Sequence, residues 1–182
     1  MSSTPARTPA VSAPEISVPG ARMRATRRSA AERRAEITDA AEAIARSEGL
    51  SAVTMRAVAA RAGVAPTLVI HHVESMDHLV AEAFTRIVAA ELAEITSFAG
   101  RVAEAGERLD AVLDTVLDGA RDEVTLVWVE AWALGRRNVP LAAAVRAQMD
   151  AWRAFFAALI HAGCDAGRYR VADPPAVAGQ LL

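Results

Sequence analysis

From residue 29 onward, apolar residues recur every three or four positions, which is the period of an amphipathic α-helix. The first such run follows Ser29-Ala-Ala-Glu32, a capping box in which serine and glutamate side chains satisfy the first amides of a helix. The apolar positions continue through Ile37 and Ile44 until Gly49, which we expect to supply a left-handed stop. The pattern therefore predicts a first helix between Ser29 and Gly49.

Two short helices are predicted next. Thr54 is a good N-cap for a helix from Met55 to Ala62, which Gly63 would end. Pro66 is favoured at the first position of another helix, because its missing N–H would have no partner there. Two short helices joined by a tight turn that contains glycine form a helix-turn-helix, which we place at about 54–73.

The segment Thr67-Leu-Val-Ile70 also suits a short buried strand, because it is rich in β-branched residues. We favour a helix, since strand propensity spans only about 1 kcal/mol and no second strand is available for pairing. Helical phasing then places Val69, Ile70 and Val73 on one side with Pro66, where they can pack against the first helix. The other side, which has no reason to be buried, carries Thr67, Leu68, His71 and His72.

The remaining chain keeps the helical pattern. Ser75 is the N-cap of a helix that we expect to continue to about Phe98 and to end at Gly100. Further helices are predicted near 103–118, 122–137 and 140–163, and from Pro174 to the C-terminus at Leu182. Gly119 is expected to end the helix near 103–118. We therefore expect an all-α protein.

Residues 1–28 consist mainly of Ser, Thr, Pro, Ala and Arg, with hardly any large apolar side chain. Such a segment cannot offset the entropy of ordering, so we predict a disordered arm. Its arginines could remain solvated or could contact phosphate or the minor groove. The chain then divides into this arm, a helix-turn-helix head at 29–92 and a second helical domain at 93–182, which looks short at its C-terminus.

The formal net charge of −2 hides an uneven distribution. Residues 1–72 carry ten arginines and six acidic residues, whereas residues 73–182 carry ten arginines and sixteen acidic residues. The sequence contains no lysine, so every strongly basic side chain is a guanidinium, which can make forked contacts with phosphate or base edges. The N-terminal part therefore suits a polyanion.

Several classes of protein are disfavoured by residues that the sequence lacks. Cys164 is the single cysteine, no Cys/His cluster has metal-ligand spacing, and no run approaches the ~18 apolar residues of a membrane span. No glycine-rich phosphate loop and no nucleophile with an evident base is present. We expect a cytoplasmic protein without metal or cofactor, which is not an enzyme.

The exposed side of the second short helix carries groups that can read DNA. Thr67 can hydrogen-bond a base edge, Leu68 can contact a thymine methyl, and the paired His71 and His72 can bind phosphate or guanine acceptors. Arg56, at the start of the preceding helix, can contact a backbone phosphate or remain solvated.

Residues 30 to about 92 resemble the N-terminal domain of the TetR family of bacterial transcriptional repressors, and the spacing matches without a gap. The resemblance is carried by Ala40-Ala41, Gly49-Leu50, the run Thr54 to Ala59, Ala62-Gly63-Val64, and Val69 to Val73 followed by Ser75, Asp77 and Leu79. It implies that the helix at Pro66 enters the major groove of double-stranded DNA and that a dimer binds a pseudo-palindromic operator. The candidate DNA contacts are Thr54, Arg56, Pro66, Thr67, Leu68, His71, His72 and Ser75.

Four positions depart from the family pattern, and one of them is Ala65, which stands where a serine cap is frequent. Ile70 stands where Tyr is usual, Val73 where Phe is usual, and Met76 where Lys is usual. Ile70 and Val73 would keep a packing role, but Met76 cannot neutralise a phosphate and Glu74 beside it adds repulsion. Each lost phosphate contact weakens DNA binding by an amount that does not depend on the DNA sequence.

Residues 122–182 more loosely resemble the C-terminal domain of the family's betaine-repressor-like branch. The matching features are Trp128 to Trp132, Arg136-Arg137-Asn138, the helix with Trp152 and Phe155-Phe156, and Gly163 to Gly167. In such proteins the last two long helices form a four-helix bundle with the second subunit, and a small molecule binds the domain. Trp128, Trp132 and Trp152 are candidate effector-pocket residues, although ordinary core packing explains them as well. Glu130 and Arg136 could orient a polar group of the ligand.

The leading hypothesis is a transcriptional repressor that a small-molecule effector, of unknown identity, releases from its operator. The alternative is an all-helical interaction protein that keeps the fold without binding an operator, which Glu74, Met76 and the short C-terminus would suit.

Overall fold

The structure is a computed structural model, and it describes residues 29–117 and 121–182. Every regular element in those ranges is helical, so the predicted all-α class is confirmed. The elements are α1 (Ala30–Glu48), η1 (Leu50–Ala52), α2 (Met55–Ala62), α3 (Pro66–His72), α4 (Met76–Arg101), η2 (Ala105–Glu107), α5 (Arg108–Leu117), α6 (Asp122–Gly135), α7 (Val139–Asp165) and α8 (Pro174–Ala178). The predicted arm at 1–28 and the stop at Gly119 lie outside the described residues.

The predicted helix starts in the head are confirmed. The amide of Ser29 donates to Glu32 Oε2 at 2.7 Å and the amide of Glu32 donates to Ser29 Oγ at 3.1 Å, which completes the capping box. Gly63 ends α2 in the left-handed conformation, with φ 65° and ψ 36°. Gly49 ends α1 differently from the prediction, because its φ of 90° is combined with an extended ψ of 165°. The chain thus leaves α1 extended and enters η1 directly.

Several helix boundaries differ from those predicted. Helix α4 passes through Gly100 to Arg101, because a single glycine costs a helix only about 1 kcal/mol and the neighbouring Ala99 is buried. Helix α6 stops at Gly135, two residues early. Helix α7 continues past Gly163, whose missing Cβ leaves room for a tyrosine ring.

Two further differences concern the distal end of the chain. The helix expected near 103–118 begins only at Arg108, after the 3-10 turn η2 around the buried Gly106. The last helix was predicted to reach Leu182, but α8 ends at Ala178. Gly179 caps it by donating to Pro175 O, and the amides of Gln180 and Leu181 donate to the carbonyls of Val177 and Ala178 in turns that follow.

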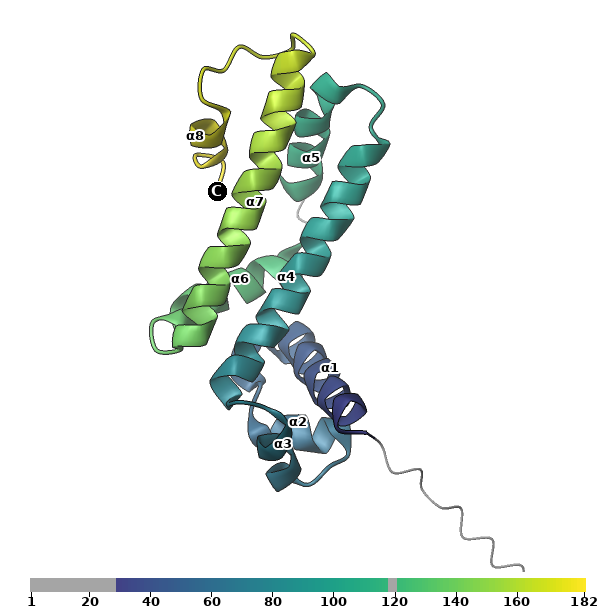
Figure 1. Ribbon diagram of the computed structural model, residues 1–182, viewed down its shortest axis with the longest axis vertical. Coiled ribbons are helices and arrows are strands. Elements are labelled where there is room, and N and C mark those ends of the chain that lie inside the picture. The colour runs from purple at the N-terminus through teal and green to yellow at the C-terminus, as the bar shows by residue number, and fades with distance from the viewer. Residues whose placement is uncertain (1–28, 118–120) are drawn as a thin grey trace, which may run out of the picture.

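The molecule is elongated, with α1, α2 and α3 forming a head at one end (Figure 1). Helix α4 begins in the head and runs the length of the body beside α7, while α5 and α6 lie behind this pair and α8 lies on the other side of α7. One continuous core connects head and body, because buried side chains of α4 contribute to both. The position of the head on the body is therefore set along α4.

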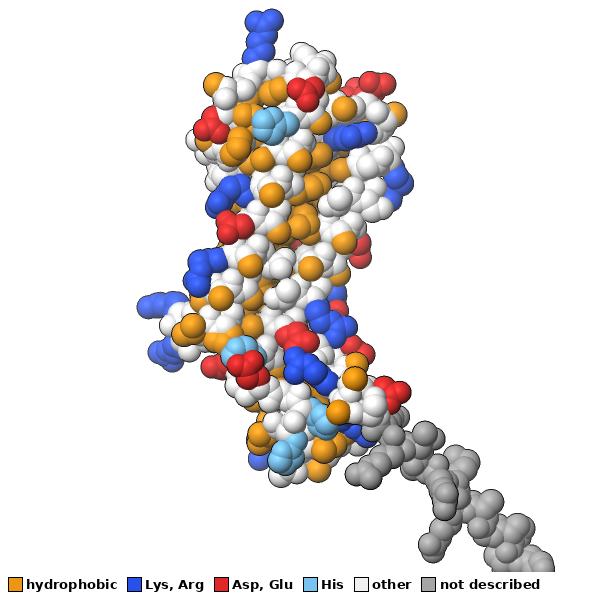
Figure 2. Space-filling view, viewed as in Figure 1, with side chains coloured by type: hydrophobic (Ala, Val, Ile, Leu, Met, Phe, Trp, Pro, Cys, Tyr) orange, Lys and Arg blue, Asp and Glu red, His pale blue; other side chains and the backbone are white. Residues whose placement is uncertain are grey.

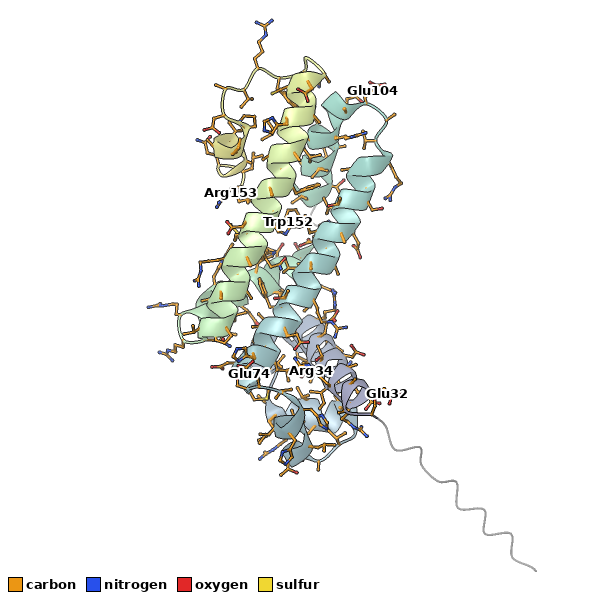
Figure 3. All side chains as sticks on the ribbon, in the orientation of Figure 1. Glu32, Arg34, Glu74, Glu104, Trp152 and Arg153 are labelled. Atoms are coloured by element: carbon orange, nitrogen blue, oxygen red, sulfur yellow. The ribbon has the colours of Figure 1, made fainter. Side chains whose placement is uncertain are left out.

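Polar contacts fix α1 against α4. Arg86 of α4 lies 2.8 Å from Asp39 and 2.9 Å from Glu42 of α1. Arg34 of α1 donates to Glu82 at 2.9 Å and to the carbonyl of His72, at the end of α3, at 3.1 Å. Figure 3 labels Arg34 at this junction, where it ties α3 to both longer helices.

We predict that Phe84→Ala destabilises the whole protein. Phe84 is fully buried in α4, and its ring meets the Trp128 ring edge-on, with centroids 5.1 Å apart, so the substitution leaves a cavity between head and body. The free energy of unfolding should fall by about 3–5 kcal/mol in a denaturant titration. Leu117→Ala is the control, because a side chain that is 79 % exposed should change stability by no more than about 0.5 kcal/mol. Equal effects of the two substitutions would contradict this account of the core.

Candidate functional site

The helix-turn-helix segment forms the free end of the head. Helix α3 has no side-chain cap at Ala65, and Pro66 occupies its first turn, as predicted. Val69 is fully buried and Val73 packs partly on the core, so both hold α3 to the head. Thr67 and His71 are exposed on the opposite side.

Four of the predicted positions on α3 are wrong. Ile70 and Pro66, both assigned to the packing side, are exposed, and Ile70 keeps 57 % of its surface. Leu68 and His72, both assigned to the exposed side, are half-buried. The buried face is centred on Val69, so residues one position before and after it lie at equal angles to either side, and contacts with the other head helices decide which of them is covered.

Thr54 and Ser75 are both occupied as helix caps. Thr54 Oγ1 accepts from the amide of Ala57 at 3.2 Å, and Ser75 Oγ accepts from the amide of His78 at 3.1 Å. Arg56 is exposed in the first turn of α2. Met76, where the resembling family usually has lysine, is half-buried and packs on the core, so it serves the fold at that position.

The body contains a cavity of about 240 Å³. All three tryptophans of the chain line it, so the structure brings Trp128, Trp132 and Trp152 together as the sequence suggested. Trp152 is buried on the side of α7 that faces α4, whereas Arg153 points toward α8 (Figure 3). Trp128 and Trp132 follow one another on α6, with ring centroids 5.9 Å apart.

The charged residues that line the cavity are Glu91 and Arg121, which form an ion pair that was not predicted from the sequence. Glu91 of α4 lies 3.4 Å from Arg121, which precedes α6, and its side chain is only 10 % exposed. Burial raises the pKa of the Glu91 carboxyl above its usual value, although the Arg121 guanidinium opposes this effect. A signal was present, because Glu91 continues the spacing of the buried Phe84, Ile87 and Val88 and thus lies on the apolar side of its helix.

Glu130 and Arg136, considered as ligand contacts, lie elsewhere. Glu130 accepts hydrogen bonds from the amides of Leu50 and Ser51 in the head. Arg136 is exposed in the turn between α6 and α7. Neither residue lines the cavity with the tryptophans.

Comparison with known protein families agrees with this arrangement of head and cavity. A model described as "Bacterial regulatory proteins, tetR family" matches residues 37–83, and one described as "BetI-type transcriptional repressor, C-terminal" matches residues 105–182. The chain belongs to the TetR family. Its C-terminal part is of the BetI type of transcriptional repressor, and regulators of the TetR family are DNA-binding proteins that are not enzymes.

Solved structures share this TetR fold. A transcriptional regulator from Saccharomonospora viridis in complex with choline is 23 % identical, with a TM-score of 0.68 over 83 % of this chain and 80 % of that one. A TetR-family regulator from Rhodococcus sp. is 26 % identical, with a TM-score of 0.65 over 83 % and 81 % of the two chains. FadR from Bacillus subtilis in complex with stearoyl-CoA is 17 % identical, with a TM-score of 0.59 over 81 % and 79 %. No curated protein matches the sequence.

Two features are absent from the part of this TetR-family chain that the structure describes. None of its helices is long and apolar enough to cross a membrane. None of its His, Cys, Asp and Glu side chains gather in a group of three or more that could hold a metal ion.

The raised pKa of Glu91 predicts a pH-dependent stability. Its stabilising contribution is fully present below the unfolded pKa of 4.5 and is lost as the pH rises through the folded pKa. The free energy of unfolding of the wild type, measured relative to Glu91→Gln in denaturant titrations, should therefore fall as the pH rises above the unfolded pKa of 4.5. Glu123→Gln, an exposed carboxylate on α6, is the control. A constant difference between wild type and Glu91→Gln would show that Glu91 ionises normally.

Proposed function

We propose that α3 enters the major groove of double-stranded DNA, with Thr67, Ile70 and His71 toward the base edges. The observation that carries this proposal is their exposure at the free end of the head, in a stretch without carboxylates. Between Gly49 and Val73 the chain has two arginines, two histidines and no acidic residue. Figure 2 shows histidine side chains over the helix-turn-helix, at the lower end of the molecule. A polyanion that approaches α2 and α3 meets no carboxylate from this stretch, and the nearest one along the chain is the exposed Glu74, directly after it.

The other proposed contacts surround α3. Arg56 would bind a backbone phosphate, and the half-buried Leu68 and His72 would make contacts at the edge of the helix. Pro66 would approach the backbone at the start of α3. Thr54 and Ser75 cap α2 and α4, whose N-terminal amides suit phosphate oxygens.

The proposed binding unit is a homodimer on a pseudo-palindromic operator in the bacterial cytoplasm. Two heads read half-sites about 34–36 Å apart, which is one turn of the duplex. Residues 29–92 would form the DNA-binding unit, residues 93–182 the effector and dimerisation unit, and the arginines of the 1–28 arm would add phosphate contacts. The family and the long α7 of the body support this arrangement.

The proposed effector is a small molecule with apolar groups and a positive charge, bound in the cavity lined by Trp128, Trp132 and Trp152. Tryptophan faces attract cations. Glu91 would supply the counter-charge, with the cation of the ligand taking the place of Arg121 as its partner. The choline complex of the Saccharomonospora viridis regulator supports this class of ligand. The effector would release DNA by binding more tightly to the conformation whose heads do not fit the operator.

Replacing the proposed DNA contacts should weaken operator binding. We expect His71→Ala to reduce affinity for the gene's own upstream DNA by about tenfold, because one base contact contributes roughly 1–3 kcal/mol. Arg56→Ala should weaken binding to all sequences and lower the slope of log affinity against log salt by about one. Both are measured by anisotropy of labelled DNA, with a stoichiometry of two chains per operator.

Arg146→Ala is the control, because this exposed arginine lies on α7 in the body. Unchanged affinity and salt slope in both head variants would contradict the proposed contact surface.

Choline is a direct probe of the proposed pocket. Because every tryptophan of the chain lines the cavity, choline binding should change tryptophan emission in a saturable way. Glu91→Gln should weaken that binding by about tenfold, since a charged partner contributes roughly 1.5–3 kcal/mol. Sodium chloride at equal ionic strength is the control. Absence of any choline effect would count against a cationic effector of this size.

A further inference from the structure

One carboxylate on α6 forms hydrogen bonds with the head. Glu130 projects from α6 onto the turn between α1 and η1, where its Oε2 accepts from the amide of Leu50 and lies 3.4 Å from the amide nitrogen of Ser51. The residue is partly buried, so the contact is shielded from bulk solvent. The two residues joined by the Leu50 bond are eighty positions apart in the sequence.

Gly49 leaves the space that this carboxylate occupies. A Cβ built on Gly49 would lie 2.5 Å from Glu130 Oε1 and 2.7 Å from Oε2, which is closer than non-bonded atoms approach. The φ of 90° at Gly49 also favours glycine. The turn is therefore shaped to receive the side chain of Glu130. We call this contact, formed by Gly49, Leu50, Ser51 and Glu130, the head clasp.

The helix that carries Glu130 is also a wall of the cavity. Thr125, Trp128 and Trp132 of α6 all line it, and Trp128 packs against Phe84 of α4. A ligand that displaces these side chains must move α6 or the rings on it. Because α6 is a continuous helix from Asp122 to Gly135, a shift at its cavity side reaches Glu130 within the same rigid element.

We propose that Glu130 is a positioning residue that transmits the state of the cavity to the DNA-binding head through the head clasp. The inference rests on the proposed function for its biological meaning, but the mechanical link is a property of the free protein. When α6 shifts, its carboxylate pulls or releases the turn that follows α1, and α1 in turn packs on α2, α3 and α4. The link also works in reverse, because coupling between two sites is reciprocal.

The test uses the three tryptophans as reporters. All of them line the cavity and none lies in the head, so their emission reports events at the cavity. Gly49→Ala inserts a methyl group against Glu130 from the head side. We expect this substitution to change tryptophan emission in the wild-type background and to have no effect on emission in a Glu130→Ala background.

Gly63→Ala is the matched control. Gly63 is also a head glycine with positive φ, but a Cβ there would meet nothing within 4 Å. It therefore adds a Cβ to a head glycine of positive φ without touching α6, with less backbone strain than at Gly49, because the left-handed region tolerates a Cβ better than the extended conformation of Gly49 does. The proposal would be overturned if Gly63→Ala changed tryptophan emission as much as Gly49→Ala does. It would also be overturned if Gly49→Ala changed emission equally in the wild-type and Glu130→Ala backgrounds.

Hydrogen exchange gives a second readout on the free protein. Glu130→Ala should speed exchange of the Leu50 and Ser51 amides by roughly ten- to a hundredfold, the effect of losing a hydrogen bond to a charged group. Glu130→Asp, which keeps the charge on a shorter side chain, should restore part of the protection. Unchanged exchange in Glu130→Ala would overturn the head clasp.

A third experiment uses operator DNA and does not require the Gly49→Ala variant to fold. Saturating the wild type with its upstream DNA should change tryptophan emission excited at the red edge, whereas Glu130→Ala should bind the same DNA with no emission change. An equal change in both proteins would overturn the proposal. If the wild type does not bind that DNA, the proposed function fails, while the Gly49 cycle and the exchange rates still decide on the head clasp.

Discussion

The burial of one side of α4 is the constraint on which the rest of the structure depends. Leu79, Phe84 and Ile87 pack where α4 meets the head, and Ile95 packs further along the body. Since one rigid helix of 26 residues serves both parts, the head cannot rotate freely. The exposed side of α3, which is the proposed recognition surface, and the cavity are thus held in a defined relation by apolar contacts, which are non-directional and tolerate small shifts.

Polar contacts then define the angle between the head and the body, which apolar packing leaves adjustable. The head clasp binds α6 to the end of α1, and the buried Asn138 binds the turn after α6 to the start of α4. The Asn138 side chain donates to the carbonyl of Asp77 at 3.2 Å and accepts from the amide of Leu141 at 2.8 Å. Hydrogen bonds depend on distance and direction more steeply than apolar contacts do, so these two links are suited to distinguish one head position from another.

The departures from the family pattern in the head make sense in this packing. Met76 packs on the core at the start of α4, where lysine would place a charge, and Ile70 presents an apolar surface to solvent at the tip of α3. An exposed isoleucine on a recognition surface suits contact with thymine methyl groups. The head therefore carries no basic side chain at position 76 and exposes an apolar side chain at position 70.

The sequence by itself determined the helices, the helix starts in the head and the helix-turn-helix, because capping residues and apolar spacing act over only a few positions. The capping box at Ser29 and the left-handed Gly63 are of this kind. Tertiary structure decided what local spacing leaves degenerate: which neighbour of Val69 is covered, how far α4 and α7 extend past glycines, and that Glu91 faces the cavity. The head clasp joins residues that no local rule relates, since its geometry exists only once α6 crosses the end of α1.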